Sequence, residues 1–172
     1  MKGIVIYKSK YGATKQYAQW LASKLGFQLS KADEVTAHSL NGVDVVILGS
    51  SVYIGKLLIK PWIEQYAEIL KRKKLFLFIV CGTPASDKQK TGAIVAKNLP
   101  GELVEKSQVY FLKGSLHLEK LSLLDKFALR MGANFEKDPV LKQRMLKGYD
   151  EVKEENLNPL LENLQELLVV KA

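Results

Sequence analysis

The sequence predicts a single α/β domain built on a mostly parallel sheet. Short runs of β-forming residues alternate along the chain with stretches whose apolar residues recur at helical spacing. One run, residues 75–81, is almost wholly apolar, which is typical of a strand covered on both faces. The length of 172 residues fits one domain with a sizeable core. No repeat or linker interrupts the alternation, so we expect one domain over residues 1–172.

Four β-rich runs are the expected strands. They cover residues 2–8, 43–49, 75–81 and 108–112, and the first three end in loops of small or polar residues. In open α/β sheets, ligands bind beyond the carboxyl ends of the strands, near the point where the strand order reverses. We therefore expect a binding site where the first two of these strands end.

Helices are expected between the strands and at the end of the chain. They cover residues 13–25, 60–72, 88–99 and 156–169. Gly26 directly follows the first expected helix, at a position where helices commonly end. Pro61 lies in the first turn of the second, where its missing N–H is harmless.

One connection is too long for this alternation. More than forty residues separate the strand near Leu112 from the last helix, whereas a usual connection has about 2–6 residues. We expect an insertion at about residues 114–150, with a helix over 116–132 and a charged helical stretch near 138–155.

Composition limits the partners and the location. The 26 basic and 18 acidic side chains give a net charge of +8, which suits anionic partners, although it also serves solubility alone. A single cysteine, Cys81, excludes an internal disulfide and is expected to be a buried apolar residue. No apolar stretch approaches the ~20 residues of a spanning helix, and residues 3–7 are too short for a signal-peptide core. A cytoplasmic protein is therefore expected, and no nucleic-acid recognition motif is visible.

The loop after the first strand is a candidate phosphate site. It reads Ser9-Lys10-Tyr11-Gly12-Ala13-Thr14 and leads into the first helix. A helix N-terminus offers free N–H groups to an anion, Gly12 allows close approach, and Ser9 and Thr14 add hydroxyl groups. Because neither a G-x-G-x-x-G nor a Walker pattern is present, a mononucleotide is favoured over a dinucleotide or a nucleoside triphosphate. The alternative is an ordinary helix capped by Ser9 or Thr14.

Two further strand ends add to this candidate site. Residues 48–55 follow the second strand, and their Tyr53 could lie against a planar ring for which Gly49 and Gly55 leave room. The alternative is a surface aromatic residue. Residues 81–87, after the third strand, form a small-residue turn with exposed backbone groups.

These three loops resemble those of the flavodoxin-like family, whose phosphate loop is typically T-x-T-G-x-T. The resemblance implies an open parallel sheet of order 2-1-3-4-5 with helices on both faces, and a bound flavin mononucleotide (FMN). Tyr11 departs from the usual Thr or Ser, so a backbone contact alone is expected there. The residues that the resemblance implies for the cofactor are Ser9, Lys10, Tyr11, Gly12, Ala13, Thr14, Ser51, Val52, Tyr53, Ile54, Gly55, Cys81, Gly82 and Thr83.

One branch of that family is more similar still. Residues 49–55, 113–117 and 124–131 resemble the menaquinone-dependent protoporphyrinogen dehydrogenases, which also carry an insertion after the last core strand. This resemblance implies oxidation of protoporphyrinogen IX, with electrons passed to a quinone in haem biosynthesis. The alternatives are a flavodoxin-type electron carrier, although ordinary carriers are acidic, and a non-enzymatic flavin-binding module.

The insertion suggests a partner surface. Leucines and Phe127 mix with lysines and Arg130 over residues 116–131, which fits a basic amphipathic helix on an anionic membrane. The alternative is a helix packed on its own domain. His117 could donate a hydrogen bond or relay a proton near the flavin, although a structural role is the simpler expectation. Lysines that could aid anionic groups are Lys10, Lys56 and Lys113.

Overall fold

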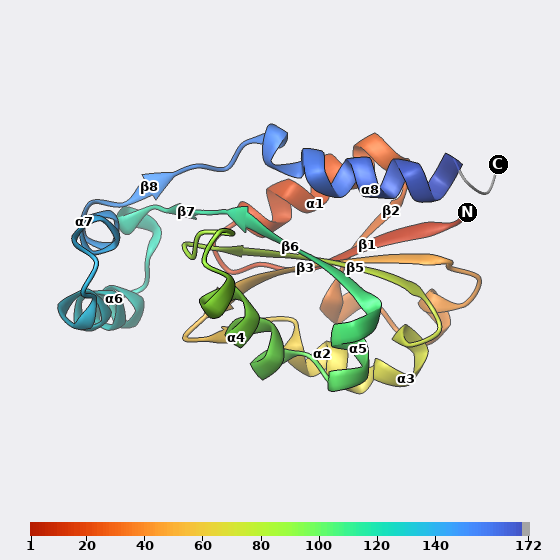
Figure 1. The fold of residues 1–172 in the computed structure, drawn as a ribbon, viewed down its shortest axis with the longest axis horizontal. Helices are drawn as coiled ribbons and strands as arrows, with labels where there is room; N and C mark the ends of the chain where they lie inside the picture. Colours follow the sequence, from red (N-terminus) through yellow and green to blue (C-terminus); the bar gives the residue numbers. More distant parts are fainter. Residues whose placement is uncertain (170–172) are drawn as a thin grey trace.

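The structure, a computed structural model, describes the backbone of residues 1–169. Its main sheet runs β2-β1-β3-β5-β6, with every neighbouring pair parallel (Figure 1). This confirms the expected order 2-1-3-4-5. The strands are β1 (Gly3–Lys8), β2 (Gln28–Lys31), β3 (Val45–Tyr53), β5 (Lys74–Cys81) and β6 (Ser107–Lys113).

Helices cover both faces of the sheet (Figure 1). One face carries α1 (Ala13–Leu25) and α8 (Asn158–Val169). The other carries α2 (Lys60–Gln65), α3 (Ala67–Leu70), α4 (Lys88–Asn98) and α5 (Gly101–Lys106). The described residues also form short 3-10 turns: η1 (Ala32–Glu34), η2 (His38–Leu40), η3 (Leu118–Lys120) and η4 (Glu154–Leu157).

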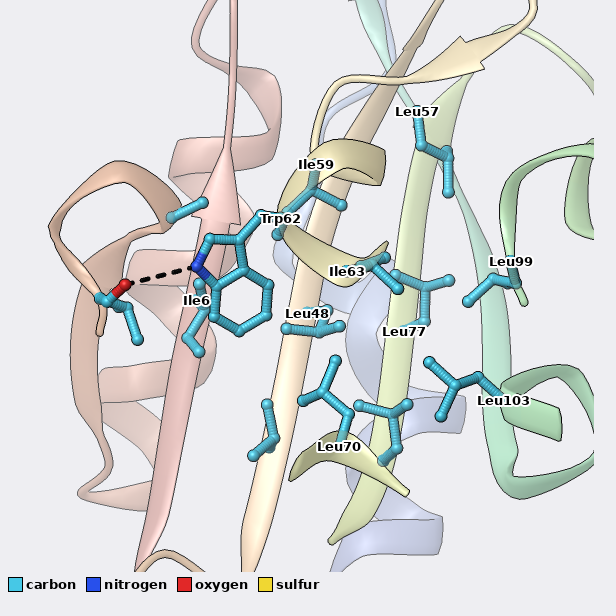
Figure 2. Close-up of a cluster of buried hydrophobic side chains, with 14 of the residues drawn as sticks. Ile6, Leu48, Leu57, Ile59, Trp62, Ile63, Leu70, Leu77, Leu99 and Leu103 are labelled. Carbon is cyan, nitrogen blue, oxygen red and sulfur yellow. Dashed lines mark hydrogen bonds between the residues drawn. The ribbon is translucent and has the colours of Figure 1, made fainter. Parts of the chain in front are cut away.

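Successive strand residues feed two separate cores because side chains alternate across a sheet. Ile4 and Ile6 join the core under α2, whereas Val5 and Tyr7 join the core under α1 and α8. Figure 2 shows the first core, where Trp62 packs over the sheet and its indole N–H donates to the Val35 carbonyl (3.5 Å). Strand β5 is buried on both faces, which confirms the expectation from its apolar sequence.

Two expectations about the core elements were wrong. Strand β2 was not expected, because its sequence, Gln-Leu-Ser-Lys, is short and polar, and it lies at the sheet edge beside β1. The helix expected over residues 60–72 is divided into α2 and α3. The break is at Tyr66, whose backbone (φ −108°, ψ 14°) leaves the helical region.

The expected insertion is a helical hairpin, residues 115–150, closed at its base by two short strands. Strand β7 (Ser115–Leu116) pairs antiparallel with β8 (Tyr149–Asp150), and α6 (Leu123–Phe135) and α7 (Pro139–Lys147) lie between them. The hairpin stands at the end of the sheet where β6 finishes (Figure 1).

Both helix boundaries expected in the hairpin were wrong. The helix expected from residue 116 begins at Leu123, because the Ser122 side chain caps it by accepting the Asp125 N–H (3.1 Å). The stretch expected over 138–155 ends at Lys147, where Gly148 adopts φ +78° and the chain enters β8. Among residues 1–169, no helix is long and apolar enough to cross a membrane.

Candidate functional site

A cavity of about 330 Å³ lies where β1, β3 and β5 end. It brings together most of the residues that the sequence singled out, together with residues of the hairpin. The predicted residues that line it are Ser9, Lys10, Tyr11, Ala13, Thr14, Ser51, Val52, Tyr53, Ile54, Cys81 and Gly82. Gly12, Gly55 and Thr83 lie in the same loops but do not line it.

The loop after β1 presents the start of α1 to the cavity. Gly12 precedes the helix with φ +100°, a conformation that favours glycine, and its N–H donates to Ser9 Oγ (3.1 Å). No side chain caps α1, so the expected alternative of a cap by Ser9 or Thr14 is wrong. The first N–H groups of a helix have no acceptor within it. They remain available to an anion here.

Thr14 supplies an unpaired hydroxyl at the same place. Its residue is 1% exposed, and Oγ1 has no hydrogen-bond partner in the structure. A buried hydroxyl without a partner costs stability. Thr14 lines the cavity at the uncapped start of α1.

The end of β3 carries Tyr53 into the cavity. Strand β3 continues through residues 51–53, which were expected to form a loop, and pairs antiparallel with β4 (Lys56–Leu57). Ile54 (φ 48°) and Gly55 (φ 70°) form the turn between them. The Lys10 ammonium lies 3.8 Å from the centroid of the Tyr53 ring, a cation–π contact.

Gly49 does not leave room for a ligand ring, as the sequence suggested. A Cβ atom at Gly49 would lie 2.2 Å from Cζ of Phe78 on the neighbouring strand. The space above Gly49 is therefore filled by a core aromatic side chain.

The end of β5 supplies Cys81 and Gly82. Burial raises the pKa of the Cys81 thiol, which points to the Thr83 carbonyl (3.7 Å between sulfur and oxygen). Gly82 lies against the hairpin, because a Cβ there would be 2.9 Å from the Tyr149 hydroxyl. The third loop and the hairpin thus close one side of the cavity.

The hairpin contributes a charged residue that the sequence did not single out. Asp125 is 6% exposed, and its carboxylate accepts hydrogen bonds from the Tyr11 and Tyr53 hydroxyls, the latter at 2.5 Å. It also pairs with the Lys10 ammonium at 2.8 Å. The bond to Asp125 raises the pKa of Lys10. The Tyr11 hydroxyl is thus held by Asp125, and a backbone contact alone between Tyr11 and the phosphate stays a prediction.

Other hairpin residues in the wall are mostly apolar. They and their neighbours are Gly114, Ser115, Leu116, Leu121, Ala128, Leu129, Met145 and Tyr149. The apolar residues of the insertion sequence indicate that it packs against something. They do not indicate which residues of the domain the hairpin covers.

Three further predicted residues lie outside this cavity. His117 faces Asp150 (3.3 Å) and Glu119 (3.7 Å). Lys56 does not line the cavity, and Lys113 approaches Glu151 at 4.0 Å. Within residues 1–169, no cluster of His, Cys, Asp and Glu side chains could hold a metal ion.

Comparisons with known proteins give a family and several similar folds. Residues 4–141 match the family described as Flavodoxin domain. Comparison with curated proteins gave no match. A flavodoxin from the domain Archaea has a similar fold, with 20% identity, a TM-score of 0.42 and coverage of 64% of this chain and 85% of that one.

Two other solved structures are similar in the same way. Megasphaera elsdenii flavodoxin in its two-electron reduced form shows 19% identity and a TM-score of 0.45, covering 63% of this chain and 82% of its own. A flavoprotein in complex with FMN from Lactobacillus acidophilus shows 18% identity and a TM-score of 0.46, covering 65% and 91%. The family match extends over most of the chain, and the chain therefore belongs to the flavodoxin domain family.

Proposed function

We propose that this protein binds FMN in the cavity at the ends of β1, β3 and β5 and transfers electrons through it. The observation that carries the proposal is the unpaired Thr14 hydroxyl beside the uncapped start of α1. Such a cradle suits a phosphate monoester. Membership of the flavodoxin family supports FMN as the molecule that bears it.

Each loop has a separate task in this proposal. The Ser9 and Thr14 hydroxyls and the first N–H groups of α1 bind the phosphate. Tyr53 offers its ring to the flavin, and Cys81 and Gly82 lie at the edge of the flavin ring. FMN, when bound, supplies the redox chemistry, while the protein supplies binding, orientation and electrostatics.

The function that this site supports best is that of an electron-transfer flavoprotein. A second candidate is a dehydrogenase that oxidises an anionic small molecule, namely protoporphyrinogen IX, with a quinone as acceptor. The hairpin favours this second candidate, because Leu121, Leu129 and Met145 give the cavity an apolar wall beside the predicted flavin position. The apolar ring system of such a substrate fits an apolar wall better than a protein partner does.

The two candidates differ in turnover. The purified protein, loaded with FMN and reduced by dithionite, is expected to pass electrons to menadione and to a redox protein such as cytochrome c. Oxidation of protoporphyrinogen IX at a rate proportional to the loaded protein supports the dehydrogenase, and its absence supports the carrier. An FMN-loaded protein that dithionite cannot reduce would contradict both.

We also propose that the outer face of α6 touches an anionic membrane. Leu124, Phe127 and Phe135 are 81%, 67% and 78% exposed, and Lys126 and Arg130 lie between them. Apolar side chains flanked by cations suit a bilayer with acidic headgroups. The protein is expected to bind phosphatidylglycerol vesicles but not phosphatidylcholine vesicles. The double variant L124S/F127S should lose that binding, and unchanged binding would contradict this surface.

A further inference from the structure

Asp125 connects the hairpin to the loops of the proposed flavin site. Its carboxylate receives the Lys10 ammonium and the Tyr11 and Tyr53 hydroxyls, which come from the loop after β1 and the end of β3. Burying a carboxylate costs free energy unless charged and hydrogen-bonding partners compensate it. The three partners provide that compensation, so this contact holds the start of α6 against the cavity.

Two of the three partners of Asp125, Lys10 and Tyr11, belong to the proposed phosphate loop, and the third, Tyr53, belongs to the proposed ring side of the cavity. Lys10 and Tyr11 belong to the same loop as Thr14, and Asp125 lines the same cavity as all three. The backbone N–H of Ser122, the residue that caps α6, also points to the Tyr11 hydroxyl (3.5 Å). A phosphate bound at the start of α1 would therefore meet a second anion that already pairs with Lys10, a cation of the same loop.

The small size of the cavity also favours movement of the hairpin when a ligand binds. Its volume of about 330 Å³ lies at the lower end of the roughly 300–1,000 Å³ of small-molecule sites. Part of its wall is the hairpin itself, through Leu121, Ala128 and Leu129. Release of the hairpin would widen the cavity.

We propose that Asp125 competes with the flavin phosphate for Lys10 and Tyr11, so that FMN binding releases the hairpin. The inference rests on the proposed FMN site. Asp125 is then a positioning residue that couples the hairpin to the flavin site. The closed hairpin lowers the affinity for FMN, and bound FMN lowers the stability of the Asp125 contact by the same factor. Riboflavin, which lacks the phosphate, does not compete with the carboxylate.

The test compares FMN and riboflavin binding to wild type, Asp125→Asn and Glu119→Gln by flavin fluorescence quenching. Glu119→Gln removes the same charge from an exposed position of the insertion outside the cavity, so it is the matched control. Asp125→Asn is expected to lower the Kd for FMN by about fivefold or more, with less change for riboflavin. Glu119→Gln should change neither.

Limited trypsin digestion of the wild-type protein is the second measurement. Exposed basic residues of the hairpin such as Arg130 should be cut faster after FMN is added, and riboflavin should not have this effect. A higher or unchanged Kd for FMN in Asp125→Asn, or FMN protection of the hairpin, would overturn the inference. Absence of FMN binding to wild type would overturn the proposed function instead, so the two failures are distinguishable.

Discussion

The Lys10 ammonium lies 3.8 Å from the centre of the Tyr53 ring, so the loop after β1 touches the end of β3 directly. The contact follows from the sheet, because β1 and β3 are parallel neighbours with Lys8 opposite Ser50. Residues beyond the ends of two such strands meet at one edge. Lys10 and the hydrogen bond to Asp125 together fix the orientation of the Tyr53 ring.

Relative to Tyr53→Phe, which also lacks the hydroxyl bonded to Asp125, Tyr53→Leu should weaken FMN and riboflavin binding to the same degree. The ring contact concerns the flavin and not the phosphate, and an aromatic pair contributes about 0.5–1.5 kcal/mol beyond its buried area. The expected rise in Kd is roughly tenfold, measured by fluorescence quenching. Tyr110→Leu, on β6 and outside this cavity, is the control and should leave both constants unchanged. A Tyr53→Leu variant that loses affinity for FMN alone would show that Tyr53 does not contact the flavin ring.

Thr14→Val should weaken FMN binding without destabilising the protein. A hydrogen bond to a charged group contributes about 1.5–3 kcal/mol, which corresponds to a Kd roughly 10- to 100-fold higher. Because the hydroxyl is buried without a partner among the described residues, its removal should leave the melting temperature of the flavin-free protein equal or higher.

Thr91→Val is the matched control for Thr14→Val. The Thr91 hydroxyl is also buried, but it donates to the Asp87 carbonyl (2.8 Å). That variant should melt at a lower temperature and bind FMN normally. If Thr14→Val destabilised the free protein as Thr91→Val does and left FMN affinity intact, the hydroxyl would have a structural role.

Cys81 should react slowly with iodoacetamide, and more slowly with FMN bound. Burial raises the pKa of its thiol, so the reaction should reach half its maximal rate above the pH typical of free cysteine. The raised pKa also means that stability is retained below the pKa of the unfolded thiol and falls as the pH rises through the folded value. Since the chain has one cysteine, mass spectrometry reports this site alone. An alkylation rate that FMN does not change would place the flavin away from Cys81.

Gly49→Ala should destabilise the sheet. Its Cβ would lie 2.2 Å from the Phe78 ring, and overpacking of this kind costs about 1–3 kcal/mol. Gly92→Ala is the control, since a Cβ in the middle of α4 meets nothing within 4 Å. It should stabilise the protein by about 1 kcal/mol. Urea unfolding measures both, and equal stability of Gly49→Ala and wild type would contradict the packing.

Local patterns predicted the central elements of this fold. The apolar run in β5 and the helical stripe in α1 depend on neighbouring residues alone, and the structure contains both. Strand β2 was missed because an edge strand of four residues, three of them polar, is held by pairing with β1 and not by its own sequence. The break between α2 and α3 at Tyr66 was also missed, because the spacing of the apolar residues over 60–72 does not change there.

The sequence predicted the features of each loop of the candidate site separately, but not the contacts between the loops and the hairpin. The loop of residues 9–14 could be singled out from its glycine, its hydroxyl groups and the helix that follows. Asp125 could not, because the pairing with Lys10 joins residues far apart in the chain. The space at Gly49 was assigned to a ligand because the sequence does not show that Phe78 lies opposite.

Titration of the purified, flavin-free protein with FMN and with riboflavin tests the central claim most directly. The account predicts one FMN per chain with a Kd below about 10 μM and markedly weaker binding of riboflavin, because the phosphate is held by Thr14 and the start of α1. Fluorescence of FMN that stays unquenched throughout the titration, or equal affinity for the two flavins, would contradict it.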